Sequence, residues 1–164
     1  MKVKAFNKVV DEQSDALYRF ILKHVRDEAT ASDIVQESFE RLWNKRNEVN
    51  EKKVKSYLFS TAYHLMIDWQ RKESKEVNFE ENESDTMMTD TFSNNYTGAK
   101  EYVEQLLDDL SAQQKAVLLL RDYEGYNYKE IGEITALNES QVKVYIHRAR
   151  HYLKEKIGKI ESII

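Results

Sequence analysis

The chain has no proline and only four glycines in 164 residues, and this shortage of helix breakers is the strongest constraint on its fold. Proline costs about 3 kcal/mol inside a helix and glycine about 1 kcal/mol, whereas the frequent Leu, Glu, Lys, Gln and Ala are good helix formers. The sequence therefore predicts an all-α protein. Each half of such a chain holds only a modest core, so we expect two small helical domains.

Composition excludes several classes of protein. The absence of cysteine rules out disulfides, thiol nucleophiles and cysteine-ligated metals, and it fits a reducing compartment. No apolar run approaches the roughly 20 residues of a membrane span, and the N-terminal residues lack the apolar core of a signal peptide. We expect a cytoplasmic protein with no membrane insertion and no cofactor.

The net charge of −4 is unevenly distributed. Residues 1–72 carry +3, residues 73–98 carry −6 and residues 99–164 carry −1. The middle segment also lacks a helical period, so it is predicted to be an acidic flexible linker between domains at 1–72 and 99–164. Residues 140–160 hold six Lys or Arg against Glu155 alone. Such a run suits phosphate contacts, although a solvated helix face is the ordinary alternative.

The N-terminal domain is predicted to be a bundle of three or four helices. Apolar residues at helical spacing predict a first helix over Val9–Val25 and a third over Lys53–Lys72. Between them, Thr30 and Asp33 have capping-box spacing, which predicts that a second helix starts there.

Capping signals recur in the C-terminal domain. Ser111–Gln114 and Asn127–Glu130 have capping-box spacing, and Asn138 follows a short turn that begins at Ala136. A last helix is expected to continue to about Ile157. Two short helices joined by a tight turn predict a helix-turn-helix, whose second helix enters the major groove of DNA.

On the last helix, one face is apolar and the other is polar. The residues expected to contact DNA are Asn138, Glu139, Ser140, Gln141, Lys143, Val144, His147, Arg148 and Arg150. Its N-terminal residues are candidates for base edges, and Lys143, Arg148 and Arg150 for phosphates. His147 and His151 have the spacing of metal ligands, but no third ligand completes a site, so no metal is predicted.

Two further helices carry patterns that admit two interpretations. The segment DIVQESFERLW, from Asp33 to Trp43, has a continuous polar face, which is typical of solvent exposure or of protein docking. The segment from Lys55 to Glu73 is rich in aromatic residues close to Arg71 and Lys72, which suits stacking on unpaired bases. Packing in the core is the alternative for Tyr57, Phe59 and Trp69.

These motifs resemble the extracytoplasmic-function sigma factors of bacterial RNA polymerase, a branch of the sigma-70 family. Leu110 to Leu153 resembles region 4, which reads the minus-35 element, and DIVQESFERLW resembles region 2.2, which docks on the largest subunit of the polymerase. The aromatic helix resembles regions 2.3 and 2.4, which recognise and melt the minus-10 element. The chain departs from the family pattern at Gly132, Ala136, Val144-Tyr145 and Tyr63-His64.

The resemblance implies a sigma factor that binds core RNA polymerase and promoter DNA, directs promoter-specific initiation and catalyses nothing. The family often has an anti-sigma factor as a further partner. The implied polymerase-binding residues are Asp33, Gln36, Glu37, Glu40 and Arg41. The implied minus-10 residues are Tyr57, Ser60, Tyr63, His64, Asp68, Arg71 and Lys72.

Two rival functions fit parts of the sequence. The first is a helix-turn-helix repressor or activator whose N-terminal bundle dimerises and which never binds polymerase. The second is a hydrolytic enzyme that uses carboxylates such as Glu37 or Asp68. No set of residues joins a nucleophile, a base and an oxyanion donor, so the second is the weaker.

Overall fold

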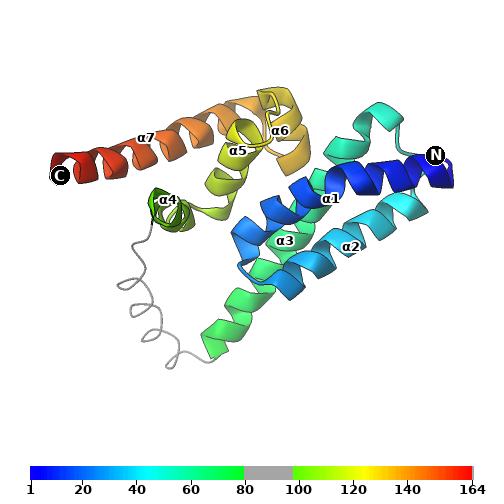
Figure 1. Ribbon diagram of the computed structural model, residues 1–164, viewed down its shortest axis with the longest axis horizontal. Helices are drawn as coiled ribbons and strands as arrows, with labels where there is room; N and C mark the ends of the chain where they lie inside the picture. The colour runs from blue at the N-terminus through cyan, green and yellow to red at the C-terminus, as the bar shows by residue number, and fades with distance from the viewer. Residues whose placement is uncertain (80–97, 164) are drawn as a thin grey trace.

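The computed structural model describes residues 1–79 and 98–163, and the regular elements in these ranges are all helices. The N-terminal half contains α1 (Val3–Val25), α2 (Glu28–Asn44), a short 3-10 helix η1 (Glu51–Lys53) and α3 (Val54–Phe79). The C-terminal half contains α4 (Ala99–Asp108), α5 (Ala112–Asp122), α6 (Tyr128–Thr135) and α7 (Glu139–Ile163). Figure 1 shows this order, and the predicted all-α fold is confirmed. Most of the predicted linker, residues 80–97, lies outside the described residues.

The turn between α1 and α2 is tighter than predicted. Arg26 ends α1 in the left-handed conformation, with φ of 58°, and Asp27 caps α2 by accepting a 3.1 Å hydrogen bond from the backbone N–H of Thr30. The predicted capping box of Thr30 and Asp33 is therefore wrong, because α2 begins at Glu28 and Thr30 lies inside its first turn. Asp27 lies three residues before Thr30, the same spacing that links Thr30 to Asp33.

Helices α1, α2 and α3 pack around one apolar core. Its fully buried members include Leu17, Phe20, Ile21, Leu42, Leu58, Phe59, Ala62 and Met66. Burial of each large apolar side chain contributes about 1.5–3 kcal/mol. Helix α3 continues past Lys72, where the third helix was predicted to end, as far as Phe79.

The C-terminal half has the three predicted helix caps. The Ser111 hydroxyl accepts a hydrogen bond from the Gln114 N–H at 3.1 Å, and the Asn127 side chain accepts one from the Glu130 N–H at 2.8 Å. Asn138 caps α7 in the same way, through a 2.8 Å bond from the Gln141 N–H. These local bonds satisfy backbone donors that have no partner within the helix.

The turn between α6 and α7 involves Gly132 and Ala136, two positions at which the chain departs from the pattern of the family it resembles. Ala136 has φ of 64°, a left-handed conformation that costs a residue with a Cβ atom roughly 1–2 kcal/mol. Gly132, one turn earlier, lies against the turn so closely that a Cβ atom there would be 2.8 Å from the carbonyl oxygen of Leu137. Glycine is thus needed at position 132 for close approach, and Ala136 adopts the strained conformation.

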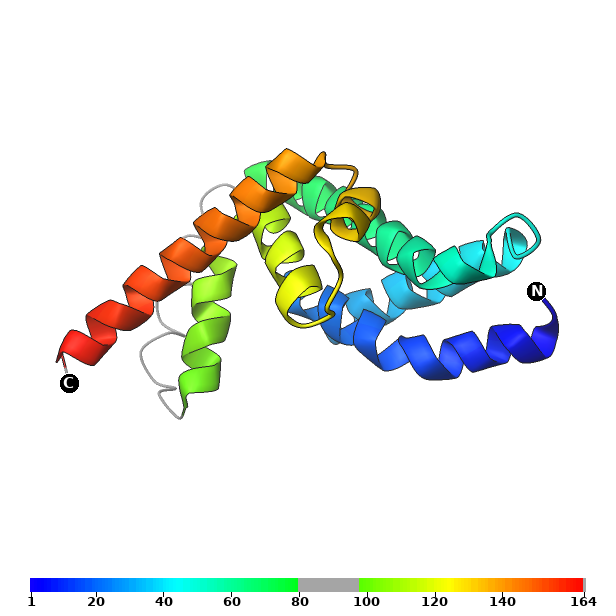
Figure 2. The same ribbon diagram turned by 90° about the horizontal axis from the view of Figure 1, so that it is seen from above.

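The two halves pack against each other. Helix α6 lies on α3, and the rings of Phe59 and Tyr126 meet edge to face with centroids 5.6 Å apart. Buried apolar residues of both halves form one continuous cluster. Seen from above, α7 runs away from the N-terminal half (Figure 2). None of the helices within residues 1–79 and 98–163 has the length and apolar character of a membrane span.

Candidate polymerase and nucleic-acid interfaces

The N-terminal part of α7 presents a continuous exposed surface. Val142, Ile146 and Ala149 are buried against α5 and α6, so the residues between them face outward. All nine side chains predicted to contact DNA are exposed. Val144, an apolar residue, is 43% exposed, as suits contact with a thymine methyl group.

Five of these nine residues have partners within the protein, and two of them, Lys143 and Glu139, pair with each other at 3.9 Å along α7. Asn138 and Gln141 cap α7 reciprocally, because the Asn138 N–H also donates to the Gln141 side-chain oxygen at 3.0 Å. Arg150 donates to the Asp122 carboxylate of α5 at 2.5 Å, and this hydrogen bond raises the pKa of the guanidinium. Arg150 therefore joins α7 to α5, whereas Lys143 and Arg148 remain the cations best placed for phosphates.

Tyr128 belongs to the same surface, although the sequence did not single it out. It is the first residue of α6 and lines a shallow pocket of about 450 Å³ with Lys143, His147 and Arg148 of α7. The Arg121 guanidinium lies 5.1 Å from its ring centroid and the Lys143 ammonium 5.8 Å. Its position after the N-cap Asn127, on the first helix of the predicted helix-turn-helix, is the signal that could have identified it.

Helix α2 displays the predicted docking face. Its exposed side chains include all five predicted polymerase-binding residues, Asp33, Gln36, Glu37, Glu40 and Arg41. Arg41 pairs with Glu37 at 3.1 Å along the helix, and the Gln36 amide lies 3.5 Å from Glu40. Exposed pairs of this kind contribute only about 0.3–0.5 kcal/mol to the stability of the helix. Their side chains can therefore leave each other and bind groups of another protein.

An apolar notch borders this face. Phe6 of α1 meets the rings of Phe39 and Trp43 at centroid distances of 6.4 and 4.9 Å, and the three side chains line a pocket of about 570 Å³. Gln36 and Glu40 line the same pocket. The contribution of Phe6 was missed because α1 was expected to begin at Val9.

The predicted minus-10 residues fall into three groups on α3. Tyr57, Ser60 and His64 line a pocket of about 500 Å³ together with Arg41 and Lys45, between α2 and α3. The His64 ring nitrogen Nδ1 lies 2.7 Å from the Ser60 carbonyl oxygen. One to two turns further along, Asp68 pairs with Arg71 at 3.0 Å, and Lys72 is exposed.

The third group is Tyr63, which differs from the other predicted minus-10 residues because its side chain is buried and only 3% exposed. Burial, with a further contribution from Tyr145 of α7, raises the pKa of its hydroxyl to about 12. Among the aromatic residues for which core packing was the alternative, Phe59 is fully buried and Tyr57 and Trp69 are half-buried.

Metal-site geometry does not occur among the described residues. No group of three or more His, Asp or Glu side chains in residues 1–79 and 98–163 lies close enough to hold an ion. His151, one member of the predicted histidine pair, instead contacts Glu155 at 3.2 Å.

Both halves of the chain match models of known protein families. The model for sigma-70 region 2 matches residues 9–76, and the model for sigma-70 region 4 matches residues 100–153. The ECF RNA polymerase sigma factor SigM of Bacillus subtilis is 31% identical over 84% of this chain and 86% of its own length. The RNA polymerase sigma factor YlaC of the same organism is 28% identical, covering 87% of this chain and 86% of its own.

Solved structures share the fold. The sigma factor RpoE of Bartonella quintana, in complex with the anti-sigma factor NepR, aligns with a TM-score of 0.76 at 22% identity over 95% of this chain and 98% of that one. CnrH, in complex with the cytosolic domain of CnrY, aligns with a TM-score of 0.71 at 18% identity over 96% and 90%. The chain therefore belongs to the extracytoplasmic-function sigma factors of the sigma-70 family, which are not enzymes but the proteins that bind core RNA polymerase and direct it to promoters.

Proposed function

We propose that promoter-specific initiation by this chain is divided among three surfaces. The outward face of α2 binds core RNA polymerase, the pocket side of α3 holds the opened minus-10 element, and the N-terminal part of α7 reads the minus-35 element. Residues 1–72 and 99–164 act as the two functional units, joined by the acidic segment 73–98. The protein works where the polymerase is, in the cytoplasm.

The observation that carries this proposal is the segregation of side chains on α7. The apolar stripe of Val142, Ile146 and Ala149 is buried, and every predicted DNA contact is exposed on the remaining faces. A second helix of a helix-turn-helix reads base edges with residues near its N-terminus, and Glu139 to Val144 occupy that part of α7.

The polymerase surface is supported by its chemistry. The exposed carboxylates Asp33, Glu37 and Glu40 lie with Gln36 on one helix face. Carboxylates and amides of this kind accept paired hydrogen bonds from arginines of a partner helix. The apolar notch formed by Phe6, Phe39 and Trp43 lies at the border of this face and offers it a site for an apolar side chain.

The minus-10 surface is supported by the pocket between α2 and α3. Tyr57 offers an aromatic face, and Ser60 and His64 offer hydrogen-bonding groups, beside the cations Arg41 and Lys45. Stacking of a base on an aromatic ring contributes roughly 1–3 kcal/mol, which offsets part of the energy of unpairing. An anti-sigma factor is a further partner that we propose, because RpoE was solved with the anti-sigma factor NepR and CnrH with the cytosolic domain of CnrY.

The test is run-off transcription with the purified chain, sigma-free core RNA polymerase of Bacillus subtilis and a library of promoter templates. We expect the chain to select a subset of templates that share a minus-35 and a minus-10 element. If the chain binds a duplex as a dimer and never associates with core enzyme, the repressor interpretation replaces this one.

A further inference from the structure

Among the described residues, four large apolar side chains are exposed to solvent. Two of them lie on α7, namely Val144, which is 43% exposed, and Ile157, which is 38% exposed. The other two are Val3 and Tyr123. A single exposed apolar side chain is common on protein surfaces, so its surroundings decide whether it has a role.

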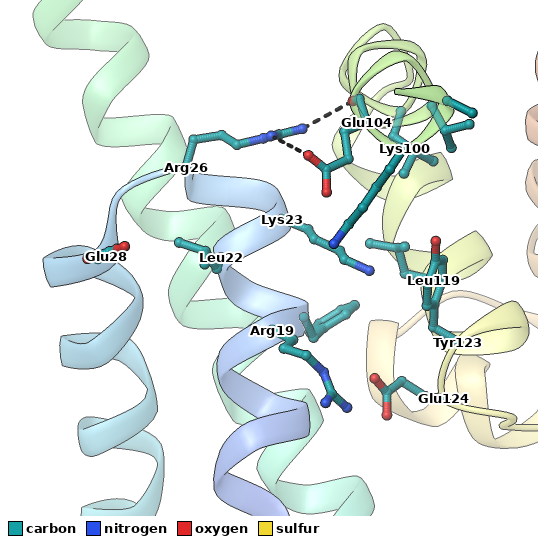
Figure 3. Close-up of a pocket in the computed structure, with 14 residues that line it drawn as sticks. Arg19, Leu22, Lys23, Arg26, Glu28, Lys100, Glu104, Leu119, Tyr123 and Glu124 are labelled. Atoms are coloured by element: carbon teal, nitrogen blue, oxygen red, sulfur yellow. Dashed lines mark hydrogen bonds and ion pairs between the residues drawn. The ribbon is translucent and has the colours of Figure 1, made fainter. Parts of the chain in front are cut away.

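The exposed ring of Tyr123 takes part in a contact between the two halves. It borders a cavity of about 800 Å³ between α1, α4 and α5, where the Lys23 ammonium lies 3.6 Å from the centroid of the ring. Figure 3 shows both side chains at this cavity. The Lys115 ammonium of α5 also donates a hydrogen bond to the Lys23 carbonyl oxygen, so α5 is bound to α1 at this point. Tyr123 therefore has a partner within the protein.

Val144 differs from Tyr123, because it lies on the proposed minus-35 surface and takes no part in the apolar core. The neighbouring Val142 and Ile146 are buried in the core, whereas Val144 belongs neither to the buried cluster nor to the side chains packed against it. It lines the shallow pocket of about 450 Å³ beside Tyr128. Packing inside the protein therefore does not account for an apolar residue at this position.

The helix holds Val144 in a defined place. The reciprocal cap of Asn138 and Gln141 fixes the first turn of α7, and the ion pair of Arg150 with Asp122 joins the helix to α5 further along. Valine is branched at Cβ and strongly prefers one rotamer in a helix, so its two methyl groups have a fixed direction. Such a side chain loses little conformational entropy when it makes a contact.

Polar groups surround Val144 on the surface of α7. Residues three and four positions away on a helix are neighbours, and here all four are exposed: Ser140, Gln141, His147 and Arg148. The Lys143 ammonium lies 5.8 Å from the ring centroid of Tyr128 on α6. One apolar side chain thus lies among groups suited to phosphates and base edges.

An apolar side chain in the major groove distinguishes bases by what each presents there. Of the four bases only thymine carries a methyl group, on C5, whereas cytosine presents an amino group. A methyl group gains free energy when it leaves water, but an amino group placed against valine loses its hydrogen bonds to water. Val144 therefore favours thymine and disfavours cytosine at the position that it contacts.

We infer that Val144 is a specificity-determining residue that reads the C5-methyl group of one pyrimidine in the minus-35 element. Thymine is the base that carries this group in unmodified DNA. A cytosine methylated at C5 carries the same group, so it should bind better than unmodified cytosine at that position. This role rests on the proposed reading of the minus-35 element by α7.

The experiment compares templates that differ only in this methyl group. The full-length chain is combined with core RNA polymerase, and its binding to a promoter duplex selected by run-off transcription is measured by fluorescence anisotropy at one salt concentration. Each thymine of the minus-35 element, on either strand, is replaced singly by deoxyuridine. We expect one replacement to weaken binding about fourfold, which is the effect of one methyl group removed from contact.

Cytosine and 5-methylcytosine at the same position give a second comparison. Cytosine should weaken binding about tenfold relative to thymine, as a mismatched base pair does. 5-Methylcytosine should bind about fourfold better than cytosine, because it restores the methyl group. Equal binding of thymine and deoxyuridine templates at every position, or of the two cytosine templates, would overturn the inference.

Two variants test the assignment to Val144. Val144→Ser removes both methyl groups at an exposed site and has a similar helix propensity, so the preference for thymine over deoxyuridine should fall from about fourfold to about one. Val144→Ala favours the helix and keeps one methyl-sized group, so the preference should fall to about twofold. Circular dichroism checks the fold of both variants. A fourfold preference that persists in either folded variant would assign the methyl contact to another residue and overturn the inference.

Ile157→Ser is the matched control. It makes the same kind of change at the other exposed apolar residue of α7, roughly 20 Å further along the helix, and should leave the preference at about fourfold. Lys143→Ala should weaken binding to all templates and leave the preference unchanged, as loss of a phosphate contact does. Failure of the chain to select any promoter would contradict the proposed function. Selection of promoters without a methyl preference would overturn only the role of Val144.

Discussion

The carbonyl oxygen of Leu137 lies 2.8 Å from the position that a Cβ atom on Gly132 would occupy. This separation is below any normal contact between a carbon and a backbone oxygen. Gly132→Ala should therefore lower the free energy of unfolding by about 1–3 kcal/mol, as overpacked sites do. Urea denaturation measures the change. Gly158→Ala is the control, since a Cβ there meets nothing within 4 Å and should stabilise α7 by about 0.5–1 kcal/mol.

Substitution of Ala136 should change the free energy of unfolding in the opposite direction. Its φ of 64° is a conformation that glycine adopts without strain, so Ala136→Gly should raise the free energy of unfolding by about 0.5–1 kcal/mol. The gain is limited because glycine also increases the entropy of the unfolded chain. A thermal melt that moves to lower temperature would contradict the left-handed turn.

His24 should make the stability of the protein depend on pH. Burial, followed by the charges of Lys115 and Arg26, lowers its pKa from 6.5 to about 3. Because the folded-state pKa lies below the unfolded value, protonation of His24 favours the unfolded chain. The stability of the folded chain is therefore retained in full above pH 6.5, and it is lost progressively as the pH falls toward 3. The loss between pH 7 and pH 5 should be about 2 kcal/mol.

His24→Leu should remove this loss, so urea denaturation of the variant should change less between the two pH values. His151→Leu provides the control, because that side chain is exposed and its substitution should leave the pH dependence as in the parent. If the parent and His24→Leu lose stability equally, the histidine is not held neutral in the folded chain.

The cationic residues of α7 should differ in their effect on the salt dependence of promoter binding. Lys143→Ala and Arg148→Ala should each reduce the slope of log K against log salt by about 1 in holoenzyme binding to a selected promoter duplex. Arg150→Ala should leave the slope unchanged and lower the free energy of unfolding by up to about 1 kcal/mol, because its guanidinium binds Asp122. A slope that falls equally for all three variants would assign Arg150 to phosphate contact after all.

Charge reversal should disable the docking face of α2. The double substitution Gln36→Lys and Glu37→Lys should weaken binding to core enzyme by roughly thirtyfold or more, as loss of paired charges at an interface does. Fluorescence anisotropy of the labelled chain measures the affinity, and circular dichroism checks that both exposed sites leave the fold intact. Glu101→Lys on α4 is the control, and it reproduces two of the three units by which the double variant changes the net charge. Unchanged affinity of the double variant would remove the docking role from this face.

The sequence predicted local features of the fold better than contacts between distant residues. The caps at Ser111, Asn127 and Asn138 could be predicted because a cap depends on residues three positions apart. The start of α2 could not, because both Asp27 and Thr30 have a polar residue three positions later, and only the structure shows which of them leaves the helix.

Sequence patterns also located the exposed faces of α2 and α7, because helical periodicity separates apolar from polar positions. The burial of Tyr63 and the pairing of Arg150 with Asp122 depend on packing between helices that are distant in the sequence. Periodicity describes one helix at a time and contains no information about its neighbour. The roles of the exposed residues in binding remain predictions.

The hydrogen bond from Lys115 to the Lys23 carbonyl oxygen makes α1 dependent on a residue far along the chain. The last carbonyl groups of a helix have no partner inside it, and here a lysine of region 4 supplies one of them. A fragment that ends at Phe79 would therefore leave the Lys23 carbonyl oxygen to solvent, while Gln70 of α3 would still donate to the His24 carbonyl oxygen at 3.3 Å. Loss of the Lys115 contact should loosen that turn, so amide exchange at the end of α1 should respond to changes in the C-terminal half.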